Sequence, residues 1–81
     1  MLRVVFYRGK FKVLQIGLSS FIVVRKHPTC YEEHSHLSSL QGAIHLIKLI
    51  DKNHMPTSKY LQESARRILK EKEFERLKII N

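Results

Sequence analysis

Four side chains that can bind a metal ion lie within ten residues of one another: His27, Cys30, His34 and His36. Tetrahedral zinc sites use such imidazole and thiolate ligands. On an extended segment, His34 and His36 project their imidazoles to the same side. The spacing is nevertheless unlike that of the common paired-cysteine sites, and histidines near a helix start also hydrogen-bond to backbone groups. We therefore expect no metal cofactor, with a zinc site as the alternative.

The same histidines are also the residue types that a nuclease uses as general base and general acid. A lysine or arginine would then stabilise the charge on the phosphorane. The sequence supplies these types without fixing their geometry, and no motif places a base beside Cys30. We expect a protein that is not an enzyme, and nuclease activity is the alternative that the sequence leaves open.

The charge of the chain is its most general clue to a partner. It has 81 residues and carries 15 lysines and arginines against 7 acidic residues, a net charge of +8. Residues 1–31 contain no acid and six basic residues: Arg3, Arg8, Lys10, Lys12, Arg25 and Lys26. Such cations bind a phosphate backbone, and the nearby rings of Tyr7, Phe11 and Phe21 are suited to stacking on bases, although two of these three rings must also compete for places in the core. The alternative is an ordinary solvated surface.

A second basic group lies in the later part of the chain, at Arg66 and Arg67. The same segment also carries glutamates, so helical pairs four residues apart, such as Glu63 with Arg67, are expected to neutralise part of its charge. These two arginines are therefore weaker candidates for nucleic-acid binding than the basic residues near the N-terminus.

The first 26 residues have the composition of a β-meander. Three β-branched or aromatic runs, Leu2–Tyr7, Phe11–Ile16 and Phe21–Lys26, are separated by turns that contain Gly9 and Gly17. Residues 27–37 follow neither a helical nor a strand period, so we expect an irregular crossover there.

Residues 38–81 have helical periodicity. A first helix is expected to begin after Ser38, in a capping box with Gln41, and Pro56 prevents its continuation. Ser58 is the expected cap of a second helix. Its apolar phase breaks between Lys70 and Glu73, which indicates either a short third helix or an apolar stripe that contacts another protein. That stripe contains Phe74, Leu77 and Ile80.

These elements predict one α+β domain over residues 1–81: a three-stranded antiparallel β-meander followed by two or three α-helices packed on one face. The single cysteine excludes an internal disulfide and fits a reducing cytoplasm. The longest apolar or aromatic runs, Val4–Tyr7 and Phe21–Val24, are far shorter than a membrane span. We expect a cytoplasmic protein with no membrane partner.

Several elements together resemble a group of small uncharacterised proteins encoded by Gram-positive bacteria and their phages or other mobile elements. They are His34-Ser-His36-Leu37, the apolar segment from Ile44 to Leu49, and Pro56-x-Ser58-x-Tyr60-Leu61-x-Glu63-Ser64-x-x-Arg67-Ile68. The resemblance spans about residues 11–70, and neither Cys30 nor the C-terminal residues have a counterpart. It implies no activity. It singles out His34, His36, Tyr60 and Arg67 for testing, and it implies a small phage-type protein that acts by binding, including inhibition of host machinery.

Two functions from different classes therefore stand as hypotheses. The first is non-enzymatic binding to nucleic acid or a nucleoprotein surface through the basic residues of the meander, with Arg66 and Arg67 as secondary contacts. The second is a protein-binding inhibitor or regulator of a host system, with a homodimer as one form, that docks through Phe74, Leu77 and Ile80 and a sheet edge.

Overall fold

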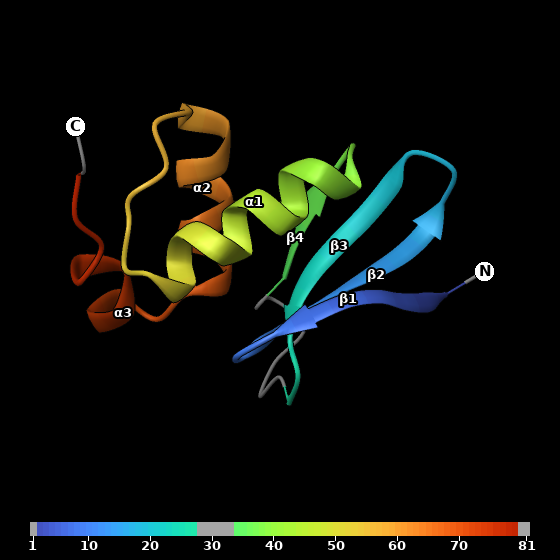
Figure 1. Ribbon diagram of the computed structural model, residues 1–81, viewed down its shortest axis with the longest axis horizontal. Coiled ribbons are helices and arrows are strands. Elements are labelled where there is room, and N and C mark those ends of the chain that lie inside the picture. Colours follow the sequence, from blue (N-terminus) through green and yellow to red (C-terminus); the bar gives the residue numbers. More distant parts are fainter. Residues whose placement is uncertain (1, 28–33, 80–81) are drawn as a thin grey trace.

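The computed structural model describes residues 2–27 and 34–79. Four strands precede three helices (Figure 1). The strands are β1 (Arg3–Arg8), β2 (Phe11–Gly17), β3 (Ser20–Arg25) and β4 (His34–Leu37), and the helices are α1 (Leu40–Asp51), α2 (Lys59–Ile68) and α3 (Glu71–Glu75). The α+β class is confirmed.

The strands form one antiparallel sheet in the order β1-β2-β3-β4. The fourth strand corrects the prediction of a three-stranded meander, because the end of the expected irregular crossover pairs with β3. Leu37 lies opposite Phe21, and Ser35 lies opposite Val23. This strand has only four residues and one large apolar side chain, so its sequence shows no visible period. Its pairing with β3 gives it an extended conformation.

The core lies between one face of the sheet and the helices, as Figure 1 shows for α1. The buried face of the sheet contributes Phe11, Val13, Phe21, Val23 and Leu37. The apolar stripe of α1 contributes four more buried residues, Ala43, Leu46, Ile47 and Ile50. Burial of this apolar surface is the main favourable contribution to folding.

The caps of the helices differ slightly from the expected ones. The N-cap of α1 is Ser39, whose Oγ accepts a hydrogen bond of 3.0 Å from the backbone N–H of Gly42. The expected cap, Ser38, lies one residue earlier. Ser58 occupies the N-cap position of α2, as predicted, but its side chain makes no capping hydrogen bond.

The break in apolar phase after α2 is a bend into a short third helix, the first of the two expected alternatives. Leu69 is extended, and α3 begins two residues later. Leu77 is 8% exposed and belongs to the core, and Phe74 packs against it. The expectation that these two residues form a docking stripe is thereby corrected, because the bend turns both toward the domain's own core. Ile80 lies outside the described residues.

Backbone hydrogen bonds hold the segment after α3 against the connection between α1 and α2. The N–H of Met55 donates to the carbonyl of Lys78 at 2.7 Å, and the N–H of Lys78 donates to the carbonyl of Asn53 at 2.8 Å. In the described part of the chain, no helix combines the length and apolar character needed to cross a membrane.

The β1–β2 hairpin depends on the backbone conformation of Gly9, whose φ is +60°. An added Cβ would also lie 3.3 Å from Oδ1 of Asp51. We expect Gly9→Ala to lower the free energy of unfolding by about 1–2 kcal/mol, because a side chain is disfavoured at positive φ. Urea denaturation measures this change. Gly17→Ala is the control, since its Cβ would make only an ordinary contact with Ser20; equal losses in the two variants would contradict the argument.

Candidate functional site

The face of the sheet opposite the helices carries eight side chains in two cross-strand rows. Opposite residues of antiparallel strands share a face, so the pairing defines the rows directly. One row is Val4, Leu14, Ile22 and His36, and the other is Tyr7, Lys12, Val24 and His34. We call this surface the outer face. It has an apolar centre, a tyrosine and a lysine toward β1, and two histidines on β4; none of the eight side chains is acidic.

Tyr7 is the exposed aromatic residue of the outer face. Its exposed fraction is 67%, and Lys12 lies directly opposite it on β2. The ammonium of Lys26 lies 5.0 Å from the centre of the Tyr7 ring. The rings of His34 and His36 meet edge to face with their centres 5.2 Å apart. The outer face therefore places one stacking surface beside two positive charges.

Phe11 and Phe21, the other two rings predicted to stack on bases, are not available for stacking. They are 4% and 7% exposed and belong to the core. These are the two of the three rings that the core takes, because their strand positions face the helices and the alternation of a strand sends Tyr7 to the opposite side.

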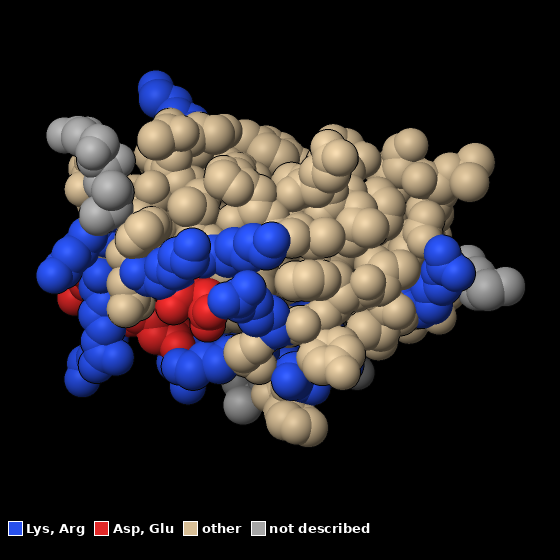
Figure 2. Space-filling view, viewed as in Figure 1, with Lys and Arg blue, Asp and Glu red and all other residues tan. Residues whose placement is uncertain are grey.

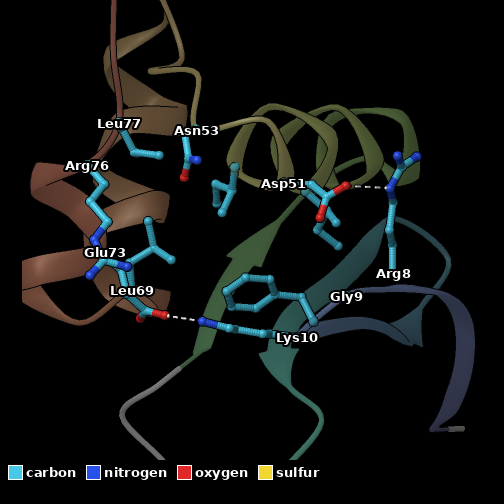
Figure 3. Close-up of a pocket in the computed structure, with 12 residues that line it drawn as sticks. Arg8, Gly9, Lys10, Asp51, Asn53, Leu69, Glu73, Arg76 and Leu77 are labelled. Atoms are coloured by element: carbon cyan, nitrogen blue, oxygen red, sulfur yellow. Dashed lines mark hydrogen bonds and ion pairs between the residues drawn. The ribbon is translucent and has the colours of Figure 1, made fainter.

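Three of the six predicted cations in the first strands lie on the helix side and form ion pairs. Figure 3 shows Arg8 and Lys10 facing Asp51 and Glu73 across a pocket. Arg8 Nε lies 3.0 Å from Asp51 Oδ2, and Lys10 Nζ lies 2.9 Å from Glu73 Oε2. Arg25 also pairs with Glu73, and Arg3 donates a hydrogen bond of 3.1 Å to Gln15 Oε1. Only Lys12 and Lys26 lie by the outer face.

The pocket of Figure 3 has a volume of about 290 Å³. Apolar side chains line it, among them Phe11, Ile47 and Leu77, together with the ion-paired residues and Arg76. In Figure 2, acidic side chains form a patch near α3, the end of α1 and the tip of the β1–β2 hairpin, and basic side chains surround it. The charges of the hairpin are therefore partly neutralised here.

Glu73 is held ionised by its neighbours. Burial by itself would raise the pKa of this carboxyl, but hydrogen bonds from the backbone of Lys70 and from Lys10 outweigh it. The charge and hydrogen bond of Arg25 act in the same direction, and the net effect lowers the pKa of Glu73 from its usual 4.5 to about 2. A carboxyl with a lowered folded-state pKa stabilises the fold above its unfolded-state pKa.

We expect the Glu73 contribution to be complete above about pH 5 and lost as the pH falls toward 2. Glu73→Gln should lower the free energy of unfolding at pH 7 by on the order of 2 kcal/mol and flatten its dependence on pH in that window. Urea denaturation at pH 7, 5 and 3 measures both effects. Glu75→Gln is the matched control, because Glu75 is exposed and pairs with no cation in the part of the chain that the structure describes. The same loss at every pH in the Glu73 variant would contradict the linkage.

The two arginines of α2 have different surroundings. The guanidinium carbon of Arg66 lies 4.3 Å from the centre of the Phe74 ring. Arg67 makes no ion pair among the described residues, so the expected pair with Glu63 is absent. The ring of Phe74 thus provides a cation–π contact for Arg66, whereas Arg67 has no acidic partner within ion-pair distance in the described part of the chain.

Arg67 lines a second, smaller pocket between β4 and α2, which we call the β4–α2 pocket. Its volume is about 180 Å³, and its lining residues are Ser35, His36, Tyr60, Glu63, Ser64 and Arg67. The hydroxyl of Tyr60 donates a hydrogen bond of 3.2 Å to the carbonyl of His36. Three of the four residues singled out by the sequence resemblance, His36, Tyr60 and Arg67, therefore meet here, and His34 lies beside His36.

Sequence reasoning missed the two serines of this pocket. Each is 3% exposed. The signal for Ser64 was its position in the apolar stripe of α2, three residues after Leu61 and four before Ile68. Ser35 gave no comparable signal, because the pattern of β4 is too short.

The residues weighed as zinc ligands are only partly placed. His27 is exposed at the end of β3, and Cys30 lies outside the described residues. Within residues 2–27 and 34–79, no three histidine, cysteine or acidic side chains are grouped closely enough to hold a metal ion. The described histidines therefore do not themselves form a metal centre.

Comparison with protein-family models, with curated protein sequences and with solved structures finds no match to this chain. The resemblance to small phage-type proteins therefore stays a prediction.

Proposed function

We propose that this protein binds single-stranded nucleic acid on the outer face of its sheet, without catalysis. The observation that carries the proposal is the grouping of Tyr7, Lys12 and Lys26 on a face whose eight paired side chains include no acid. A strand of nucleic acid needs a ring on which a base stacks and cations that contact its phosphates.

The exposure of Tyr7 favours a single strand over a duplex. Bases inside a duplex are stacked on each other, whereas the bases of a single strand are free to stack on a protein ring. Tyr7 is 67% exposed on an open sheet, so a base can approach it. Its two neighbouring lysines are placed to contact the phosphates on either side of that base.

The charge distribution supports the same surface. Arg8, Lys10 and Arg25 are engaged by Asp51 and Glu73, so phosphates would have to compete with bound carboxylates there. Lys12 has no ion pair among the described residues, and Lys26 contacts a ring rather than an acid. Both lysines are therefore available to phosphates without loss of an ion pair.

A protein partner is the second candidate, and the apolar centre of the outer face is the observation that favours it. Leu14, Ile22 and Val24 are half-buried at this centre. Beside it, Val4 on β1 is 51% exposed, and Leu18 in the neighbouring β2–β3 turn is 97% exposed. A host protein or a second copy of this chain that covered this surface would bury apolar area. Such an interface would respond little to salt, whereas phosphate contacts weaken steeply as salt rises.

We expect the double variant Lys12→Gln, Lys26→Gln to bind fluorescent single-stranded DNA or RNA about tenfold or more weakly at low salt. The slope of log affinity against log salt should become shallower by about 1.4, because two phosphate contacts are lost. Anisotropy titrations at several salt concentrations measure both quantities.

The matched control is Lys48→Gln, Lys52→Gln, which removes the same charge from exposed positions of α1 and its C-cap. It should retain the wild-type slope. Equal weakening in both double variants would mean that net charge alone drives binding, and absence of binding by the wild type at low salt would turn the search to a protein partner.

The stacking contribution is tested separately at Tyr7. We expect Tyr7→Ala to weaken binding to a single strand by about tenfold while leaving the salt slope unchanged, because stacking on a base contributes about 1–3 kcal/mol without a charge. Tyr7→Phe should retain most of the affinity, since it keeps the ring. Anisotropy titration measures the affinities; a shallower slope in Tyr7→Ala would contradict the assignment of this ring to stacking.

A further inference from the structure

Two serines of the β4–α2 pocket carry hydroxyls that are open to a ligand. Ser35 and Ser64 are each 3% exposed, and neither makes a side-chain hydrogen bond in the part of the chain that the structure describes. Neither hydroxyl oxygen is a fully buried atom without a partner, so both oxygens keep some access from the pocket. Because both serines line the same pocket, their hydroxyls are available to a ligand that enters it.

The other groups of this pocket define the charge of that ligand. Arg67 lines the pocket and forms no ion pair among the described residues, so its guanidinium offers a fork of donors to an anion. Among the described residues that line the pocket, Glu63 is the only acid, and it opposes an anion. The guanidinium of Arg67 and the hydroxyls of the two serines together suit a ligand that accepts several hydrogen bonds, as the oxygens of a phosphate do.

The pocket also adjoins the outer face. His36 belongs to one of the two rows of that face and lines the pocket as well. A single strand that crosses the sheet from β1 toward β4 therefore arrives at the pocket opening. The pocket volume of about 180 Å³ equals that of about six water molecules, which is enough for a phosphate group.

The burial of the serines distinguishes a terminal phosphate from an internal one. An internal phosphate diester carries a sugar on both sides, which keeps its phosphorus away from hydroxyls on residues only 3% exposed. A terminal monoester has one sugar and three free oxygens, so it can enter end-on. It also carries more negative charge near neutral pH than a diester does.

We propose that the β4–α2 pocket binds the terminal phosphate monoester of a single strand lying on the outer face. Ser35 and Ser64 donate hydrogen bonds to it, and Arg67 forms the ion pair. The proposal rests on the proposed function, because the outer face delivers the strand end to the pocket.

The test compares three oligonucleotides of one sequence, with a 5′-phosphate, a 3′-phosphate or hydroxyls at both ends. We expect one of the phosphorylated strands to bind about tenfold more tightly than the unphosphorylated strand. The end that gives the gain identifies the polarity of the strand on the sheet.

Three variants test whether this gain in affinity for a phosphorylated strand arises in the β4–α2 pocket. Arg67→Gln should abolish the gain in affinity, and Ser64→Ala should reduce it. Glu63→Gln should enlarge the gain, because it removes the opposing charge. Ser64→Ala should keep the wild-type melting temperature or raise it, since alanine is the better helix former, so a lost gain in this variant is not a loss of folding.

The possible failures of the two proposals are distinguishable. Equal affinity for all three strands, with Lys12 and Lys26 still required, overturns the terminal-phosphate site and leaves the proposed function standing. An equal loss for all three strands in Arg67→Gln also overturns it, because Arg67 would then contact the backbone generally. Absence of binding to any of the strands overturns the proposed function.

The pocket is also tested without a nucleic acid, by titration of inorganic phosphate followed through backbone amide chemical shifts. Saturable shifts at Ser35 and Ser64 that disappear in Arg67→Gln support the phosphate site. Absence of saturable shifts in the wild type overturns it.

Discussion

The alternation of side chains across one antiparallel sheet is the constraint on which the rest of this molecule depends. Phe11, Val13, Phe21 and Val23 must face the helices to be buried, and opposite residues share a face. Their neighbours, among them Lys12, Leu14 and Ile22, therefore face away from the helices. The candidate nucleic-acid surface is a direct consequence of core formation, because the same pairing that buries the phenylalanines sends Tyr7 and Lys12 to the outer face.

The ion pairs of Glu73 make the two faces of the sheet differ in charge. Its carboxylate pairs with Lys10 and Arg25, which come from the other end of the chain, and so connects α3 to β3 and the first hairpin. A buried cation without a partner would be costly, and the side chain of Arg25 is only 12% exposed. Asp51 and Glu73 are thus engaged on the helix side, and none of the eight paired side chains of the outer face is acidic.

Ser35 and Ser64 are buried polar residues beside the apolar core residues Leu37, Ala65 and Ile68. Ser64 occupies the apolar stripe of α2 between Leu61 and Ile68, a position where an aliphatic residue would add burial. Local departures from the rules of packing are expected where a protein binds something. Arg67 beside them forms no ion pair with any residue in the described part of the chain, which is why we place the phosphate site there.

Local periodicity in the sequence is enough to predict the α+β class, the first three strands, the two longer helices and the bend after Ile68, because each depends on residues that are close in the chain. The resemblance also drew attention to His36, Tyr60 and Arg67, without placing them together. The strand at His34–Leu37, the ion pairs of Arg8, Lys10 and Arg25, and the burial of Leu77 became visible in the folded chain alone. A strand of four residues, an ion pair between Arg25 and Glu73, and a pocket shared by β4 and α2 all depend on residues that are distant in the chain. No local pattern encodes the approach of such residues.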